Sequence, residues 1–323
     1  MKHCFIINPR AGKGLFSEKL RQKVTEICEK RNTHYDVFLP DSPEASFDYI
    51  QRMADTREEE LSFYACGGDG TLCETVNSVM RLDSQEGISV GVMPIGTGND
   101  FVRNFTPKEL FLEPAAQLDG ESVEVDLFRC NDMYSINMVN IGFDSEVVAK
   151  KEALSGKRFV PAKMAYIFGL VICLVRKPGV SMQISRDGGE YEKKKLLLTT
   201  FANGGFCGGG FYSNPGASLC DGRIDGMEIE NVSRLRFLTL VGSYKKGTHT
   251  REKLSHIVHT LKGEEFHMIF DSPMNVSVDG ELKKLDELRM KVEKGALRLR
   301  IPKGVSPVGC AMQGILRKEA VPL

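Results

Sequence analysis

The stretch Cys66-Gly67-Gly68-Asp69-Gly70-Thr71 joins an apolar run of strand length, residues 61–66, to a segment with helical spacing. The apolar positions of that segment recur at helical intervals, at Leu72, Thr75, Val76, Val79 and Met80. Glycines at such a junction let a ligand approach backbone N–H groups beside the positive end of the helix dipole. Asp69 adds a carboxylate, a ligand that Mg²⁺ prefers. The stretch predicts either a phosphate site or a tight turn in which Asp69 caps the helix.

Length and composition describe a two-domain protein with reduced thiols. A chain of 323 residues exceeds the usual size of a single core. Lysine plus arginine and aspartate plus glutamate both number 43, so no overall positive charge indicates a nucleic-acid partner. The nine cysteines are odd in number and never form a Cys-x-x-Cys pair, which is typical of a cytoplasmic protein.

Neither a signal peptide nor a transmembrane segment is predicted. The first apolar run ends at Pro9, too early for the hydrophobic region of a signal peptide. The longest apolar run, residues 167–175, is far shorter than the roughly 20 residues that span a bilayer.

The first 126 residues alternate between strand and helix patterns. Strands are expected at residues 4–7, 34–39, 61–66 and 88–93, and each is followed by a helical segment, the last through Phe101 and Phe105. This alternation is typical of a three-layer, doubly wound α/β domain with a parallel sheet. Its ligand crevice would lie at the carboxyl ends of the strands, where three glycine-bearing loops converge: residues 8–14, 67–71 and 96–101.

Residues 127–300 change to short strands and tight glycine turns, which predicts a mostly antiparallel β-sandwich domain. Helical spacing occurs at residues 162–175 and 233–245, the second with Ser233 as its cap. Residues 301–323 are expected to return to the first domain, with a short helix near 310–316. Strands are expected at residues 127–130, 134–139, 182–185, 196–202, 226–230, 266–270, 275–278 and 288–292.

The glycine loops match neither of the two commonest phosphoryl-transfer templates. The chain has no GxxxxGK[ST] loop, and no kinase-type glycine loop with HRD and DFG partners. Together the three loops resemble the diacylglycerol kinase catalytic domain family, which includes bacterial lipid kinases, sphingosine kinases and ceramide kinases. The resemblance continues in order along nearly the whole chain, at residues 140–144, 203–211, 215–225 and 278–281.

This resemblance implies a nucleotide-binding α/β domain, a β-sandwich-like domain and an active site in the cleft between them. It also implies transfer of the γ-phosphate of ATP, with Mg²⁺, to a hydroxyl of diacylglycerol or a related lipid. The protein would then be cytoplasmic and would bind the inner face of the membrane peripherally. The sequence leaves a homodimer open.

The resemblance assigns roles to residues by motif. Glu281 corresponds to the base that accepts the lipid hydroxyl proton, with Asp279 beside it, and a partly buried Glu281 is expected. Asp69 is the third catalytic candidate and the ligand of the catalytic Mg²⁺. Two exposed turn carboxylates are the alternative interpretation of Asp279 and Glu281. The implied nucleotide-binding residues are Asn8, Gly67, Gly68, Asp69, Gly70, Thr71, Thr97 and Asn99.

Residues 215–223 resemble the family's structural Mg²⁺ loop. The implied ligands are the Asp221 carboxylate and the backbone carbonyls of Ser218 and Arg223. Cys220 stands where many members have Asp or Asn, and an ordinary hairpin turn is the alternative. A second departure lies near Phe38, where some members have a nucleotide-binding Thr.

Weaker patterns and rival functions remain open. Four cations near the N-terminal loops either attract anionic lipid headgroups or form a solvated helix face: Lys13, Lys19, Arg21 and Arg103. His256 and His259 lack a third ligand nearby and are not expected to bind zinc. Gly-Gly-Asp-Gly also occurs in NAD kinases, so phosphorylation of soluble NAD is one alternative. A catalytically inactive nucleotide-binding regulator is the other, which the presence of Asp69 and Glu281 disfavours.

Overall fold

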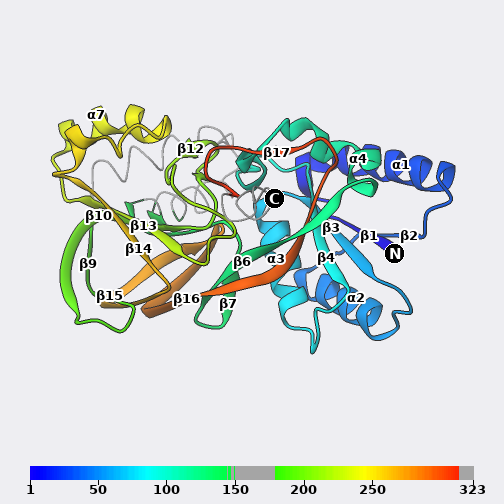
Figure 1. The fold of residues 1–323 in the computed structure, drawn as a ribbon, viewed down its shortest axis with the longest axis horizontal. Coiled ribbons are helices and arrows are strands. Elements are labelled where there is room, and N and C mark those ends of the chain that lie inside the picture. The colour runs from blue at the N-terminus through cyan, green and yellow to red at the C-terminus, as the bar shows by residue number, and fades with distance from the viewer. Residues whose placement is uncertain (144, 147–148, 150–178, 313–323) are drawn as a thin grey trace, which may run out of the picture.

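The computed structural model describes residues 1–143, 145–146, 149 and 179–312 (Figure 1). Its first half is the predicted α/β domain. Four parallel strands lie in the order β4-β3-β1-β2, namely β1 (Lys2–Ile7), β2 (Tyr35–Phe38), β3 (Leu61–Gly67) and β4 (Ile88–Pro94). The connecting helices are α1 (Leu15–Lys30), α2 (Pro43–Asp55) and α3 (Asp69–Met80).

Successive side chains of β1 enter two different cores, which makes this half three-layered. Cys4 and Ile6 pack with residues of α2 and α3, whereas Phe5 and Ile7 pack with residues of α1. A strand presents alternate side chains to opposite faces of a sheet, so helices cover both faces. Figure 1 shows α1 on one side of the sheet and α2 on the other. The predicted doubly wound architecture is confirmed.

The second half is antiparallel, as predicted. Its strands are β8 (Met138–Gly142), β9 (Val180–Arg186), β10 (Glu192–Ala202), β13 (Ile224–Glu230), β14 (Val258–Gly263) and β15 (Glu265–Val278). Every pairing among them is antiparallel. The helix α7 (Arg234–Lys245) begins where Ser233 Oγ accepts a hydrogen bond from the Arg236 N–H at 3.3 Å. A core that includes Val139, Phe201 and Phe266 fills one face of the sheet.

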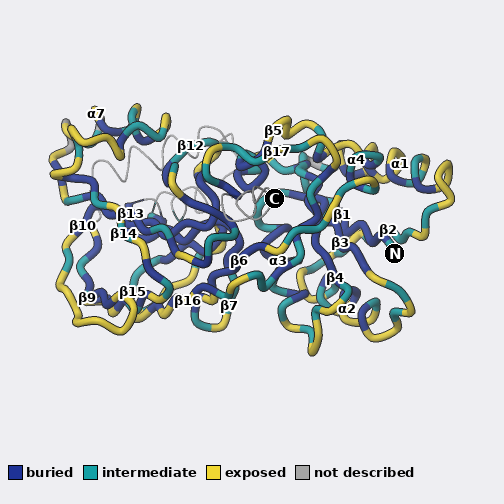
Figure 2. Tube along the Cα trace, in the orientation of Figure 1, coloured by how far each residue is buried: buried dark blue, intermediate teal, exposed yellow. Residues whose placement is uncertain are grey.

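Two long strands join the halves into one sheet. β6 (Glu121–Cys130) pairs with β16 (Glu281–Ile301), a strand of 21 residues, which also pairs with β15 and, at Leu299, with β4. Figure 1 shows β6 and β16 crossing from the β-rich half to the α/β half. The boundary expected at residue 126 therefore falls inside a continuous strand. Buried residues follow the strands through both halves, while the outer sides of the helices are exposed (Figure 2).

Several elements differ from their sequence expectation for identifiable reasons. The helix expected through Phe101 and Phe105 is only a 3₁₀ turn, η2 (Phe101–Asn104), because the Asn104 side chain donates to the Phe101 carbonyl at 2.8 Å and the chain then enters β5 (Phe105–Thr106). The strand expected at 134–139 is interrupted, since it divides into β7 (Met133–Ser135) and β8. The two strands expected within 266–278 form one strand, β15.

The remaining described segments are short, and part of the chain lies outside the description. The helix expected at 162–175 lies outside the described residues, as does most of the one near 310–316. Lys303 N–H donates to the Ala116 carbonyl at 2.9 Å, so the chain after β16 runs along the α/β half.

No helix in the described ranges has the length and apolar composition that crossing a membrane requires. The short elements are η1 (Ala11–Gly14), η3 (Lys108–Leu112), α4 (Pro114–Leu118), β11 (Phe206–Cys207), β12 (Phe211–Tyr212), η4 (Glu252–Leu254) and β17 (Ser306–Pro307).

Candidate active site

The three glycine loops meet at the carboxyl edge of the parallel sheet. Backbone hydrogen bonds continue past the strand ends, from Asn8 N–H to the Cys66 carbonyl and from Gly96 N–H to the Gly67 carbonyl, both at 3.0 Å. A Cβ at Gly96 would lie 2.4 Å from the Cα of Gly68, closer than any real contact. The glycines therefore allow two loops to touch backbone to backbone. This contact holds the second and third loops together at the edge of the sheet where the sequence predicts a ligand crevice.

Asn8 connects the first two loops through its side chain. Its Nδ2 donates to Thr71 Oγ1 at 3.1 Å, and its Oδ1 accepts the Arg10 N–H at 2.9 Å. Thr71 is buried in the first turn of α3. Both predicted residues thus organise the loops, with their polar atoms already engaged by the chain.

Asn99 closes the third loop on itself. It adopts a left-handed conformation with φ of 52°, and its Nδ2 donates to the carbonyls of Pro94 and Gly96 at 3.1 and 2.9 Å. Its buried Oδ1 accepts no hydrogen bond from any described residue. Thr97, two residues before it, is exposed. The loop therefore presents Thr97 outward while Asn99 fixes its shape.

Asp69 retains an open oxygen. It starts α3, where one carboxylate oxygen, Oδ1, accepts the Phe101 N–H at 3.0 Å. Its Oδ2 faces Gly98, since a Cβ there would lie 3.0 Å away, and within the described chain Oδ2 accepts no hydrogen bond. One oxygen anchors the side chain and the other can take a ligand. This arrangement fits the predicted Mg²⁺ ligand, because Mg²⁺ in phosphate sites needs only one or two protein carboxylates.

Glu281 comes from the other half of the chain to the same place. A Cβ at Gly70 would lie 3.5 Å from Glu281 Oε1, so the carboxylate stands over the first turn of α3. Burial first, and then the charge of Glu281, raise the pKa of the neighbouring Glu74. Glu281 itself is exposed, contrary to the partial burial expected from sequence. It lies at the start of β16, where solvent reaches it.

Asp279 is buried and accepts hydrogen bonds from the chain, although it is only two residues from Glu281. Its φ of 49° and that of Gly280, 94°, form the two-residue turn between β15 and β16. Its buried carboxylate accepts hydrogen bonds from Ser135 Oγ at 2.7 Å and from the N–H groups of Ile136, Asn137 and Met138 at 2.8–3.0 Å.

These bonds explain both the break between β7 and β8 and the orientation of the turn. The N–H groups at 136–138 bind the Asp279 carboxylate and are not free to continue a strand ladder. Burial raises the pKa of Asp279 despite its donors. Asp279 was predicted as a catalytic residue beside Glu281, but its oxygens accept hydrogen bonds from the 135–138 segment.

Two residues that had no assigned role tie the third loop to the second half. Asp100 Oδ2 accepts the Gly209 N–H and Asn104 Oδ1 accepts the Gly205 N–H, both at 2.8 Å. The Asp100 carboxylate also accepts from Arg103 Nε at 3.1 Å. Burial raises the pKa of Asp100, and so does the nearby charge of Asp69. Residues 203–211 thus contact the third glycine loop and the η2 turn that follows it. The sequence showed the motifs at residues 96–101 and 203–211, but it did not predict that they touch.

The loop predicted to bind a structural metal already contacts a cation of the chain. Asp221 Oδ2 accepts from Lys262 Nζ at 2.8 Å, and Asp221 Oδ1 accepts the Arg223 N–H at 3.0 Å. Ser218 is buried, with its Oγ 3.9 Å from Cys220 Sγ. Because a protein donor engages each Asp221 oxygen, the arrangement does not fit a divalent ion bound through this carboxylate.

The weaker sequence candidates find ordinary partners. Arg21 pairs with Glu18 at 2.8 Å and Arg103 with Asp100, so neither guanidinium is a free cation, whereas Lys19 is exposed. Phe38 stacks on Tyr49 with ring centroids 4.3 Å apart. His256 contacts Arg236 at 2.7 Å, and His259 contacts Glu230 at 3.2 Å. The described residues hold no group of three or more candidate metal ligands among His, Cys, Asp and Glu.

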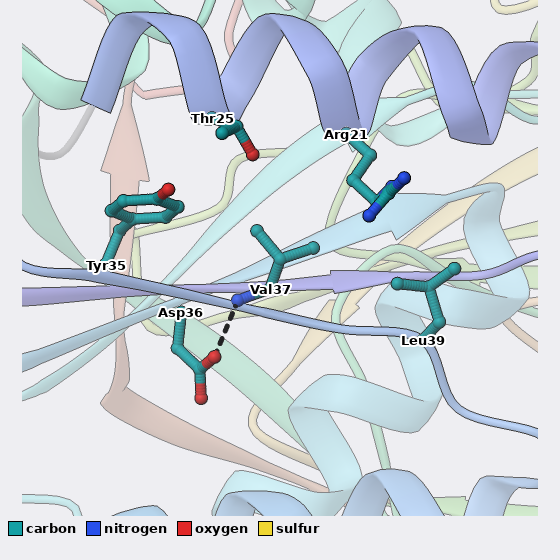
Figure 3. Close-up of a pocket in the computed structure, with 6 residues that line it drawn as sticks. All are labelled: Arg21, Thr25, Tyr35, Asp36, Val37 and Leu39. Atoms are coloured by element: carbon teal, nitrogen blue, oxygen red, sulfur yellow. Dashed lines mark hydrogen bonds between the residues drawn. The ribbon is translucent and has the colours of Figure 1, made fainter. Parts of the chain in front are cut away.

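A cavity of about 420 Å³ lies away from these motifs, between α1 and the edge strand β2 (Figure 3). The Asp36 carboxylate in it accepts the Val37 N–H at 2.9 Å and the Tyr49 hydroxyl at 3.0 Å. None of the residues predicted to bind nucleotide lines it. Its lining consists of Arg21, Thr25, Tyr35, Asp36, Val37 and Leu39.

Known proteins share both halves of this architecture. Residues 2–130 match the family of the diacylglycerol kinase catalytic domain, and residues 137–301 match the YegS C-terminal NAD kinase beta sandwich-like domain. A diacylglycerol kinase of Bacillus subtilis strain 168 is 28% identical over 288 residues, covering 87% of this chain and 90% of that protein. A candidate lipid kinase of Staphylococcus aureus strain MSSA476 is 27% identical over 281 residues, covering 85% and 88%.

A solved structure supports the same fold. A candidate diacylglycerol kinase from Bacillus anthracis strain Sterne superimposes with a TM-score of 0.73 at 20% identity, covering 92% of this chain and 96% of that one. The fold and the two family matches define a two-domain lipid kinase. The chain belongs to the diacylglycerol kinase catalytic domain family, with a YegS-type C-terminal domain. This confirms the family that the motifs indicated.

Proposed function

We propose that this protein transfers the γ-phosphate of ATP, in the presence of Mg²⁺, to a hydroxyl of diacylglycerol or a related lipid. The observation that carries the proposal is the approach of Glu281 to Gly70. It brings a carboxylate of the β-rich half next to the glycine loop at residues 67–71 of the α/β half. A base and a phosphate cradle from distant parts of the sequence then share one site.

Each residue has a distinct part in this reaction. The loop amides and the start of α3 receive the ATP phosphates, since a helix N-terminus binds anions. Asp69 would hold Mg²⁺ through its open oxygen, and a bound Mg²⁺ would neutralise phosphate charge. Asn8, Thr71 and Asn99 hold the loops in the binding shape.

Glu281 accepts the proton of the lipid hydroxyl. The hydroxyl oxygen forms a bond to the γ-phosphorus, the bond from that phosphorus to the bridging oxygen breaks, and ADP leaves. The exposure of Glu281 suits a lipid that enters from outside the protein. Asp279 does not touch the reacting atoms in this scheme. It is a positioning residue that fixes the turn on which Glu281 stands.

The acceptor would approach along the hairpin of β15 and β16. A cavity of about 530 Å³ lies there, and its polar lining includes Glu146, Asn275 and Lys284. Lys284 is three residues beyond Glu281 on β16, or roughly 10 Å along a strand. Side chains three residues apart on a strand lie on opposite faces, so this cavity would hold a part of the lipid other than the hydroxyl that is phosphorylated. Exposed Phe16 and Lys19 on the first turns of α1 support a peripheral approach to the inner face of the membrane.

The test is a phosphoryl-transfer assay with the purified full chain and labelled Mg²⁺-ATP. Acceptors are presented in detergent micelles as separate panels of diacylglycerols, monoacylglycerols, phosphatidylglycerol and sphingoid bases, with soluble NAD as a further acceptor. Labelled phospholipid from at least one lipid is the expected result. Transfer to NAD alone would establish the soluble-acceptor alternative, and ATP binding without any transfer would indicate a regulator.

A further inference from the structure

Three carboxylates lie in or contact residues 221–225, at the junction of the two halves of the molecule. Asp221 and Asp225 both contact Lys262 Nζ, at 2.8 and 3.3 Å. The third, Asp126, accepts the N–H groups of Gly222 and Gly295 at 2.7 and 2.8 Å. One ammonium therefore lies between two carboxylates while the third engages only the backbone.

The position of Lys262 is set by the β-sheet and not by a flexible loop. β13 and β14 pair with Asp225 directly opposite Lys262, so the ammonium is fixed beside one carboxylate by strand register. The turn before β13 then brings Asp221 to the same nitrogen. This leaves no carboxylate of the predicted metal loop without a cation.

The loop so held connects distant parts of the molecule. Leu219 is fully buried in the core of the α/β half. Its carbonyl accepts the Asp126 N–H at 2.6 Å, and its N–H donates to the Ala311 carbonyl at 2.8 Å. Whatever neutralises Asp221 and Asp225 therefore stabilises the junction between the halves.

We propose that the Lys262 ammonium is the resident cation of this loop and takes the position that a divalent ion would otherwise occupy. The junction is then held without metal, and the ammonium and Mg²⁺ are alternatives at the same two carboxylates. A lysine brings one charge and a fixed tether, whereas Mg²⁺ would require oxygen ligands that Asp221 does not have open. The proposal concerns folding stability and is independent of which acceptor is phosphorylated.

The test compares thermal unfolding without nucleotide in EDTA and in millimolar MgCl₂. We expect the same melting temperature for the wild type in both. Lys262→Met should melt roughly 2–4 °C lower in EDTA, and MgCl₂ should restore at least half of the loss. Lys294→Met is the matched control, because Lys294 is an exposed lysine beside the same turn that pairs with a single carboxylate, Glu264, at 3.0 Å. It should show neither the loss nor the recovery.

Two further variants locate the effect. The double variant Asp221→Asn with Lys262→Met should lose the recovery in MgCl₂. Repeating the series in Asp69→Asn removes any contribution from Mg²⁺ bound in the cleft. If the Asp69→Asn protein with Lys262 intact melts at a higher temperature in MgCl₂ than in EDTA, the proposal is overturned. A Lys262→Met protein that melts like Lys294→Met, or that MgCl₂ does not restore, would overturn it as well.

Discussion

The carboxylates beside the glycine loops, Asp69 and Glu281, and those of the turn and junction regions, Asp279 and Asp221, have opposite hydrogen-bonding environments. Asp69 keeps one oxygen open, and Glu281 is exposed above the first turn of α3. Asp279 and Asp221 have donors of the chain on their carboxylates instead. The sequence places Asp279 and Glu281 two residues apart, yet only Glu281 lies over the first turn of α3. Open oxygens mark the carboxylates available for chemistry, and satisfied ones mark those that hold the fold.

The largest effect is expected at Glu281. Glu281→Gln keeps the shape of the side chain but cannot accept the hydroxyl proton, so turnover should fall by roughly 10²–10⁴-fold. Affinity for ATP and the free energy of unfolding should be unchanged, because the carboxylate is exposed. Steady-state kinetics with equilibrium nucleotide binding checks this. Turnover within a factor of two of wild type would remove Glu281 from the role of base.

Asp279→Asn should have the next largest effect, and on stability. An amide would turn an N–H toward one of the donors that the carboxylate now accepts, leaving buried groups unsatisfied. The free energy of unfolding should fall by about 3 kcal/mol. Urea unfolding measures the change. Asp132→Asn, in the turn between β6 and β7, is a control for loss of one negative charge nearby and should be close to wild type.

Asp69→Asn should weaken the use of Mg²⁺-ATP. The amide can still accept the Phe101 N–H but is a poorer metal ligand, so we expect kcat/KM for Mg²⁺-ATP to fall on the order of 10²-fold. The loss should be partly overcome at high Mg²⁺ concentration. A loss that does not depend on Mg²⁺ concentration would contradict a metal ligand at this position.

Asp221→Asn should have the smallest effect. Its carboxylate pairs with a lysine whose side chain is 46% exposed, and solvent screens such a pair. The free energy of unfolding should fall by only about 0.5–1 kcal/mol, with turnover unchanged. Unfolding in denaturant, run beside Asp279→Asn, measures the difference. An equal loss in both variants would contradict the contrast between a buried carboxylate and a screened one.

Sequence patterns predicted what depends on local order. The alternation of residues 4–93 fixed the α/β layers, since apolar periodicity and strand-to-helix glycine loops are local signals. The antiparallel character of the second half was also predicted. The Ser42 cap of α2, which accepts the Ala45 N–H at 3.2 Å, was not predicted, although it is a local signal as well.

Long-range pairings could not be predicted in the same way. The 21 residues of β16 were expected to contain only a short strand at 288–292, because its partners change along its length from β15 to β6 and β4. Gly295 interrupts the register with β6 and donates to Asp126, a contact between residues 169 positions apart. No local sequence pattern predicts the contact between Gly295 and Asp126. The Asp279 contacts with 135–138 and the Lys262 contact with Asp221 are missed for the same reason.

The most direct test of the account measures turnover and unfolding free energy side by side for Glu281→Gln and Asp279→Asn. The account predicts opposite outcomes. Glu281→Gln should lose turnover at wild-type stability, and Asp279→Asn should lose stability while its folded fraction keeps turnover within about tenfold of wild type. A stable Asp279→Asn protein without turnover, or a Glu281→Gln protein with full turnover, would contradict it.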